Sequence, residues 1–237
     1  MDRVTVVNSG HVKRRFSEYA TEIGRQFCPY IIPALEQNIL SVHSYRIDVD
    51  DLYVAQEELF YLGIIHTEMF RKLRRDGKGG VRHCLCDNVI VDFSADLSSR
   101  VAEVMSWPHW LLKILYLQTN VMYGKFWRGQ TQKDKLGRDI PSPPFNFLSI
   151  RTGIPPIDIE RFFAETPYLR GVLAEGADDG EDVHRLVPGA PSQPFDADTL
   201  REVRYYRMAL SWALATHGDE ISSEEAIKIR HGVGMSV

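Results

Sequence analysis

Residues 52–75, LYVAQEELFYLGIIHTEMFRKLRR, carry the pattern that decides the fold. Apolar residues recur there at alternating spacings of three and four, which predicts one buried stripe on an α-helix. The stripe consists of Leu52, Ala55, Leu59, Leu62, Met69 and Leu73. His66 stands where the next apolar residue would fall, and Gly63 costs a helix about 1 kcal/mol relative to alanine. We therefore predict a helix over 51–75 in which a histidine interrupts the stripe and the glycine leaves room for a flat ring.

Strand patterns surround this helix. They occupy residues 39–47, 81–93, 121–127 and 145–152. In the first of them the side chains alternate, so His43 is expected on the face opposite to Val42. Together, these strand and helix patterns predict an α+β or α/β fold. Helices 51–75 and 108–119 would pack on a single mixed sheet, and the chain would end in a C-terminal helical extension.

The chain divides into three parts by composition. Residues 1–175 are predicted to form the α/β core domain. Residues 176–195 are rich in Gly, Pro and acidic side chains, which predicts an exposed, mobile loop or linker. Residues 196–237 are predicted to form C-terminal helices packed on the core. Within the core, the helical region 95–118 is expected to break before Pro108, which would begin a second helix.

Composition and charge exclude several classes of protein. The formal net charge is −4 and the pI is about 6.1, without the excess of Lys and Arg that is typical of nucleic-acid binding. The longest apolar runs are shorter than the ~18 residues that a membrane span needs, and the N-terminus has no apolar signal segment. Three cysteines at irregular spacing argue against a disulfide framework. We expect a cytoplasmic protein that binds neither nucleic acid nor membrane.

Familiar catalytic motifs are missing. The glycine cluster DGKGGV at 76–81 precedes a strand and not a helix, so it lacks the context of a phosphate loop. In the motif HCLC, Cys84 and Cys86 would share one face of a strand and His83 the other. Structural zinc normally needs four ligands, so buried, inert cysteines are the preferred interpretation of this motif.

A few residues remain as candidates for chemistry. Cys28, in the turn FCPY, could ligate haem iron or attack an electrophile as a thiolate, or it could be a buried cysteine. Lys125 and Arg151 are long cations on two adjacent predicted strands, suited to a carboxylate or a haem propionate, or to a cross-strand ion pair. Trp127 could line a pocket or belong to the core.

Two resemblances add to this picture. The blocks CPYIIPALEQNILSV, VMYGKFWRG and PSPPFNFLSIRTGIPPIDIERFF, within residues 25–165, resemble the signature blocks of an uncharacterised bacterial family often found among natural-product genes. Many members of that family would have His where Trp127 stands. The order of a Cys-Pro turn, strand, helix, strand ending in VDF, a Trp-Leu-Leu helix and two strands is similar in layout to the haem-dependent N-hydroxylases that act on free arginine.

The second resemblance implies a haem-dependent oxygenase of secondary metabolism that oxidises a small amino-acid-like substrate at nitrogen. His66 is the first candidate for the iron ligand, followed by His43 and Cys28, while Arg151 and Lys125 would hold propionates or a substrate carboxylate. The expected partners are the substrate, an unidentified electron donor and, as an open alternative, a second copy of the chain. Two other functions stay open: a cofactor-free protein that binds a small ligand or a carrier-bound intermediate, and a non-haem or flavin enzyme.

Overall fold

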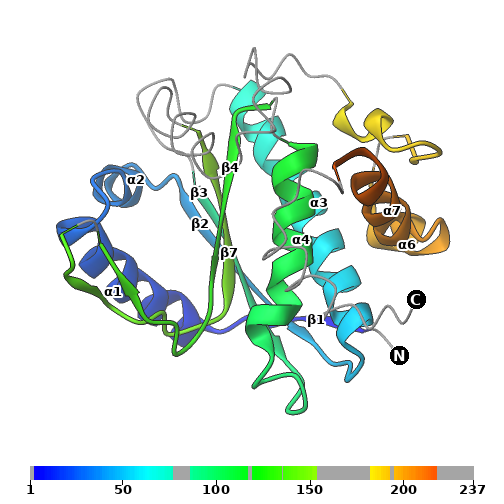
Figure 1. Ribbon diagram of the computed structural model, residues 1–237. Helices are drawn as coiled ribbons and strands as arrows, with labels where there is room; N and C mark the ends of the chain where they lie inside the picture. Colours follow the sequence, from blue (N-terminus) through cyan, green and yellow to red (C-terminus); the bar gives the residue numbers. More distant parts are fainter. Residues whose placement is uncertain are drawn as a thin grey trace.

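The computed structural model describes residues 3–76, 86–116, 119–134, 136–153, 182–192 and 195–217. Its centre is a five-stranded mixed sheet in the order β1-β2-β3-β7-β4 (Figure 1). The strands are β1 (Val4–Val6), β2 (Leu40–Ile47), β3 (Cys86–Phe93), β7 (Phe147–Thr152) and β4 (Val121–Phe126). The four predicted strands thus lie in one sheet, and the expected α+β class is confirmed.

One β–α–β unit organises the sheet. β2 and β3 run parallel, and α3 (Leu52–Arg75) lies between them in the chain. The other pairs are antiparallel: β1 with β2, β7 with β3, and β4 with β7. In the register of the central strands Ser41 faces Asp87 and Leu40 faces Cys86, so successive residues of β3 belong to opposite faces of the sheet.

Helices cover both faces of the sheet (Figure 1). On one face lie α1 (Gly10–Gln26) and α2 (Ile31–Glu36), and on the other α3 and α4 (Val101–Leu115). Two C-terminal helices, α6 (Ala197–Glu202) and α7 (Tyr205–His217), pack outside against α3. A hairpin of β5 (Gln132–Lys133) and β6 (Asp139–Ile140) follows β4.

Some sequence predictions fall outside the described residues. These are the first part of the predicted strand 81–93, with His83 and Cys84, the helix predicted after Gly153, and the last predicted helix beyond His217.

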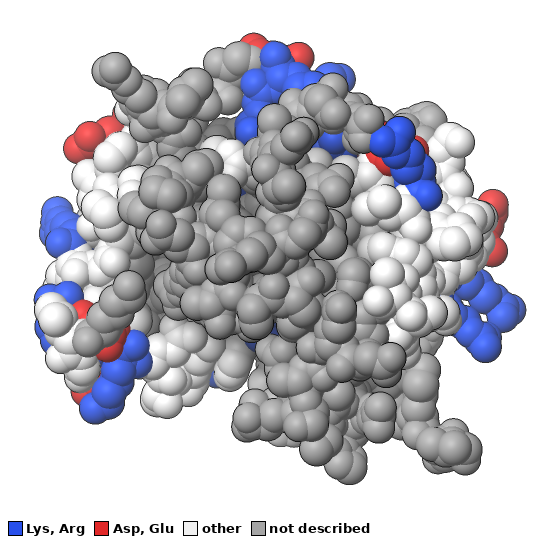
Figure 2. Space-filling model, turned by 45° about the horizontal axis from the view of Figure 1, so that its top comes forward, with Lys and Arg blue, Asp and Glu red and all other residues white. Residues whose placement is uncertain are grey.

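Within the described residues, no helix has the length and apolar character needed to cross a membrane. On the face drawn in Figure 2, the described Lys and Arg side chains lie in small separate groups, several of them beside Asp or Glu.

Helix α3 is enclosed on almost all sides. It begins at the predicted place, where the Asp51 side chain accepts a hydrogen bond from the Val54 amide at 2.9 Å. Ala55, Leu59 and Leu62 are buried as the stripe predicts, but Met69 is 51% exposed. The simple stripe is therefore wrong at its C-terminal end, where the side of the helix left to solvent passes through Met69, Lys72 and Arg75. Packing against the sheet and three helices also buries side chains outside the stripe.

Gly63 lets α3 and α4 approach each other. A Cβ atom there would lie 2.3 Å from Leu112 Cδ1, and Leu112 is fully buried on α4. The room that the glycine provides is filled by a leucine, so the expectation that a flat ring could pass beside it is wrong. Leu59 and Ile64, on α3, belong to the same core cluster as Leu112.

Pro108 does not break α4. The helix runs from Val101 to Leu115 with the proline inside it, although a proline cannot donate a hydrogen bond to the carbonyl four residues earlier. Trp107 and Leu111, on either side in the helix, are buried in the main core. This packing outweighs the local preference of the Trp107-Pro108 pair, so the predicted second helix is a continuation of the first.

The predicted loop 176–195 is exposed only in part. In its described portion a short 3₁₀ helix, η3 (Val183–Leu186), places His184 in the interior with none of its surface exposed. Tyr116 contacts His184 Nε2 at 2.6 Å, and Tyr205 contacts its Nδ1 at 2.6 Å. Hydrogen bonds to a buried polar cluster therefore hold this portion against the core at His184, while Arg185 and Leu186 are exposed and the mobility of the segment stays a prediction.

Glu68 is the anion of that buried cluster. Its carboxylate accepts hydrogen bonds from Tyr116 at 2.8 Å and from Arg71 at 2.9 Å, and His184 lies 3.7 Å away. Burial alone would raise the pKa of Glu68, but the hydrogen bonds from these neighbours and the charge of Arg71 outweigh it and lower the pKa to about 2.

We predict that Gly63→Ala destabilises the protein by about 1–3 kcal/mol, because the new methyl group must displace Leu112 from a filled core. Chemical denaturation measures the loss. Gly10→Ala is the matched control, since nothing lies within 4 Å of its Cβ position, and its effect should stay within about 0.5 kcal/mol. If Gly63→Ala is as stable as the control, the helices do not meet as described.

Glu68→Gln should lower the free energy of unfolding at neutral pH by about 3 kcal/mol. The folded pKa of Glu68, about 2, lies below its ordinary value of 4.5, so this stability is present above pH 4.5 and is lost as the pH falls toward 2. Urea denaturation across this range should show the wild type and Glu68→Gln converging at low pH. Glu36→Gln, at an exposed glutamate, should follow the wild-type profile throughout.

Candidate functional site

The residues singled out by sequence separate into two places. Cys28 and Arg151 line a cavity between the sheet and the α1–α2 layer, and this cavity continues around the edge strand β4 to Lys125 and to His109 of α4. His43 and His66 meet Asp87 on the opposite face of the sheet, where α3 packs. The expected single site, with His66 on iron and Arg151 on propionates, is therefore divided by the sheet itself.

The cavity, called here the α1–α2 cavity, has a volume of about 960 Å³. Helix α1 supplies Phe16, Tyr19 and Ile23 to its wall, while Phe126 and Phe147 come from the edge of the sheet. Cys28 lies where α1 ends, and its amide donates to the Ile23 carbonyl at 3.0 Å. Pro29 follows directly and turns the chain toward α2, which places the half-buried thiol at the cavity.

Charges in the described lining of the α1–α2 cavity are mostly positive. Four basic side chains contribute to it, and they are Lys113, Lys125, Lys133 and Arg151. Asp134 is the acidic residue among them, and Arg138 donates to its carboxylate at 2.6 Å. Arg151 Nη1 donates to the Thr152 carbonyl at 3.0 Å. The expectation that Arg151 contacts an acidic side chain or a ligand carboxylate stays a prediction.

Two polar groups of the α1–α2 cavity were missed by sequence reasoning. Gln130 Oε1 is buried without a hydrogen-bond partner in the described part of the chain, so it can accept a hydrogen bond from a ligand. His109 Nε2 donates to the Tyr123 carbonyl at 3.3 Å, which leaves Nδ1 with its lone pair. Burial, together with Lys113 and Lys125, holds the pKa of His109 well below its ordinary value, so the imidazole is neutral. In the sequence, the position of His109 between Trp107 and Trp110 on an apolar helix was the signal that could have indicated it as a candidate.

Trp127 has a structural role. It is partly buried and packs against the main core, and it does not belong to the cavity lining. Cys86 does line the cavity, at the register position of Arg151 on β7, and its Sγ lies 3.4 Å from Ser149 Oγ. The cavity therefore contains two thiols from separate elements.

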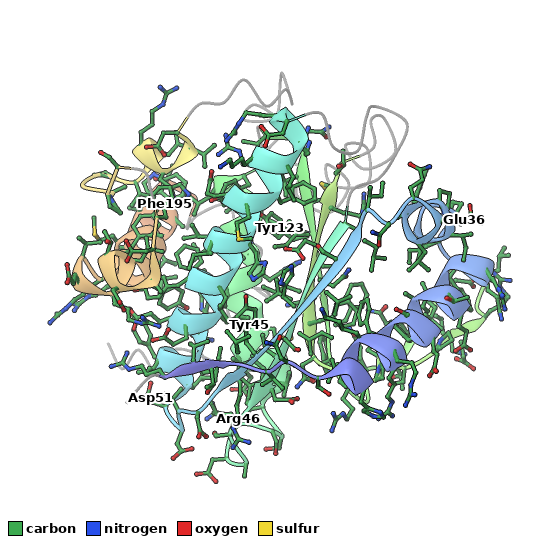
Figure 3. All side chains as sticks on the ribbon, turned by 180° about the vertical axis from the view of Figure 1, so that it is seen from behind. Glu36, Tyr45, Arg46, Asp51, Tyr123 and Phe195 are labelled. Carbon is green, nitrogen blue, oxygen red and sulfur yellow. The ribbon has the colours of Figure 1, made fainter. Side chains whose placement is uncertain are left out.

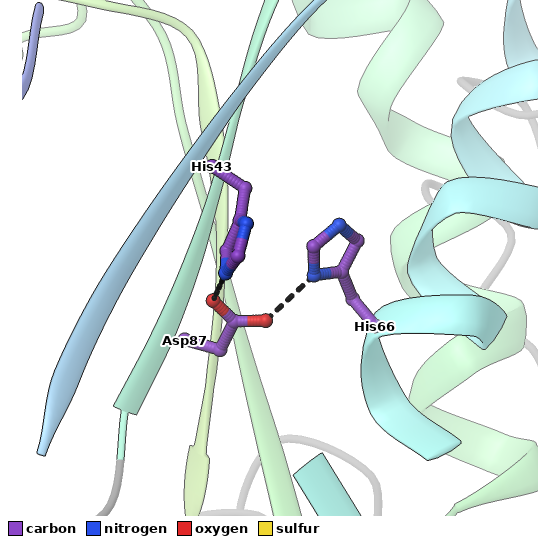
Figure 4. Close-up of side chains that lie close together, drawn as sticks. All are labelled: His43, His66 and Asp87. Carbon is purple, nitrogen blue, oxygen red and sulfur yellow. Dashed lines mark hydrogen bonds and ion pairs between the residues drawn. The ribbon is translucent and has the colours of Figure 1, made fainter. Parts of the chain in front are cut away.

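On the other face, Asp87 lies between two imidazole rings (Figure 4). His66 Nδ1 is 2.7 Å from Asp87 Oδ2, and His43 Nε2 is 3.5 Å from Asp87 Oδ1. Ser41 Oγ donates to Asp87 Oδ1 at 2.6 Å. Tyr45, seen in Figure 3 on the side of the sheet that faces α3, contacts His66 Nε2 at 2.7 Å. Alternation along β2 puts Ser41, His43 and Tyr45 on this one face, as the sequence predicts for His43.

Burial and hydrogen bonding set the charges of this cluster. Burial would raise the pKa of Asp87, but the hydrogen bonds from His66 and Ser41 and the two imidazoles outweigh it and hold the pKa below its usual value. Burial lowers the pKa of His43 despite the nearby Asp87. Burial, with Asp87, raises the pKa of Tyr45. At neutral pH the cluster thus contains a carboxylate, a neutral His43 and a protonated tyrosine.

His66 does not fit as a haem ligand. The residue is 1% exposed and the gap at Gly63 is filled by Leu112, so a group as large as haem has no room beside the ring among the described residues. Its Nδ1 and Nε2 instead lie within hydrogen-bonding distance of Asp87 and Tyr45. Cys28 fits the same role better, because its thiol lines a cavity of ligand size with aromatic walls and basic side chains.

Comparison of the chain with models of protein families, with curated proteins and with solved structures found no match in any of the three. The two resemblances drawn from the sequence therefore stay predictions, and the candidate sites rest on the geometry given above.

Proposed function

We propose that the chain is an enzyme that binds a small amino-acid-like molecule in the α1–α2 cavity. The observation that carries the proposal is the lining of this cavity, which combines aromatic walls, basic side chains and the unpartnered amide oxygen of Gln130. Its volume lies in the range of small-molecule sites. A carboxylate would complement Arg151, and an N–H group would complement Gln130.

The charge of the lining favours some amino acids over others. Arg138 already neutralises Asp134. In the described lining, no other carboxylate is present to pair with a positively charged side chain of a bound amino acid. A guanidinium or ammonium side chain would be buried without a counter-charge, at a substantial cost in free energy. We expect neutral or acidic amino acids to bind better than arginine or lysine.

His109 is the group in the described lining that is suited to take a proton. Its imidazole is neutral, Nε2 is held by the Tyr123 carbonyl, and Nδ1 keeps a lone pair. A substrate ammonium group must lose a proton before its nitrogen can react, and a neutral imidazole can accept it. Burial first, and then the positive charges of Lys113 and Lys125, hold the pKa of His109 low and keep this imidazole neutral.

Haem is the cofactor that we propose for the oxidation at nitrogen. Cys28 would ligate the iron, the aromatic rings of α1 would cover the macrocycle, and Lys125 or Arg151 would hold a propionate. Haem bound there would supply the oxidative chemistry, while the chain orients the substrate and excludes water.

We expect thermal-shift and calorimetric titration with the free amino acids to identify a neutral or acidic ligand. Arg151→Met should weaken its binding about tenfold or more, because a charge-assisted hydrogen bond to the carboxylate is lost. Arg46→Met, at an exposed arginine of β2, is the matched control and should bind as the wild type does. Equal affinities in the two variants, or preferential binding of arginine, would contradict the proposed charge complementarity.

Titration of the protein with haemin tests the cofactor separately. A Soret band should develop in the wild type and should shift or disappear in Cys28→Ser. Cys86→Ser, which removes the other thiol of the cavity, and His43→Ala, on the opposite face, should keep the wild-type spectrum. Identical spectra in all variants, or no uptake of haemin, would exclude Cys28 ligation while leaving the amino-acid site to be judged by its own titration.

A further inference from the structure

The cluster of His43, His66 and Asp87 has no part in the α1–α2 cavity. Its members come from the three successive elements of the β–α–β unit: β2, α3 and β3. The potential ligand atoms, one from each residue, all lie within 4.8 Å of one another. The two imidazole rings have centroids 4.8 Å apart and are inclined by 57°, so both turn an edge toward the carboxylate between them (Figure 4).

We infer that His43, His66 and Asp87 form a binding site for a divalent transition-metal ion, with His66 Nδ1, His43 Nε2 and the Asp87 carboxylate as ligands. Metal bonds to imidazole nitrogen and carboxylate oxygen are about 2.0–2.2 Å long, so ligand atoms around one ion lie about 3–4 Å apart. The distance between His66 Nδ1 and Asp87 Oδ2, 2.7 Å, would have to lengthen slightly, while the widest spacing in the cluster, at most 4.8 Å, would have to contract. The side chain of His43 is 40% exposed and can make that movement.

The surroundings of the three residues match the outer shell of a metal site. Ligating carboxylates and imidazoles are normally held by second hydrogen bonds that orient them. Ser41 Oγ holds Asp87 Oδ1, and the Tyr45 hydroxyl lies at hydrogen-bonding distance from His66 Nε2. When His66 donates from Nε2 to Tyr45, Nδ1 is left with the lone pair that a metal requires. Where the ring proton lies on Nδ1 and bridges to Asp87, metal binding requires it to move to Nε2, where the Tyr45 hydroxyl oxygen can accept the hydrogen bond.

Charge and donor type indicate the class of ion. Two imidazoles and one carboxylate favour Zn²⁺, Fe²⁺ or Co²⁺, whereas Mg²⁺ and Ca²⁺ prefer sites made of oxygen ligands. Three protein ligands leave a coordination position for water or another molecule, and the exposed side of His43 opens the cluster to solvent.

The experiment uses the full chain, freed of metal with a chelator and then titrated with Co²⁺ by calorimetry and visible absorption. We expect one ion per chain with the absorption of a low-coordinate site, and competition by Zn²⁺ but not by Mg²⁺. His43→Ala should weaken Co²⁺ binding at least a hundredfold, and Tyr45→Phe should weaken it about tenfold, as loss of an outer-shell partner does.

His11→Ala is the matched control, because His11 is an exposed histidine on α1 and its loss should leave the affinity unchanged. His43 is half-exposed, so His43→Ala should fold, and its unfolding transition verifies this. Equal Co²⁺ binding by the wild type and His43→Ala, or no binding by a folded wild type, would overturn the inference and leave a hydrogen-bonded cluster. Cys28→Ser and Arg151→Met should bind Co²⁺ normally, so this outcome is independent of the function proposed for the cavity.

Discussion

The burial of α3 is the constraint on which the rest of the structure depends. A helix enclosed on nearly all sides cannot direct its polar side chains to water, so each of them needs a partner inside the protein. Gln56 bonds to α7 through Tyr206, and Glu58 to α6 through Arg201. Further along the helix His66 bonds to Asp87 on β3, and Thr67 to Tyr123 on β4. The polar side chains of α3 thereby fix where the surrounding elements lie.

This arrangement explains which parts of the fold were predictable from the sequence. The strands were predictable because alternation and β-branched residues are local signals, and Asp51 marked the beginning of α3. Pro108 was misjudged because core packing on both sides of it overrides the local pattern, and Met69 because the side of α3 left to solvent at its C-terminal end passes through Met69 and Lys72. The burial of His184 depends on Tyr116 and Tyr205, residues far away in sequence, so a local reading of a Gly- and Pro-rich segment could not find it.

The candidate sites show the same limit. The pattern of β2 assigns His43 to a face, but the pairing of β2 with β3 decides that Asp87 joins it there. His66 stood out as a polar residue in an apolar stripe, and its partners became clear only from the packing of α3 on the sheet. For the α1–α2 cavity, Cys28, Lys125 and Arg151 were recognisable as chemically versatile residues. Gln130 and His109 gave only weak signals in the sequence. The unpartnered oxygen of Gln130 and the lowered pKa of His109 both arise from their three-dimensional surroundings.

The alternation of β3 also has a chemical consequence. Cys86 lines the α1–α2 cavity, and the next residue, Asp87, binds the two histidines on the opposite face. Two sites of different character are thus separated by one layer of backbone, with the cationic cavity on one side and an anionic, nitrogen-rich cluster on the other. Because the strand is buried and hydrogen-bonded on both edges, neither side chain can exchange faces without breaking the ladder. The sheet therefore keeps apart a thiol and a carboxylate that are neighbours in the chain, and places each in a different candidate site.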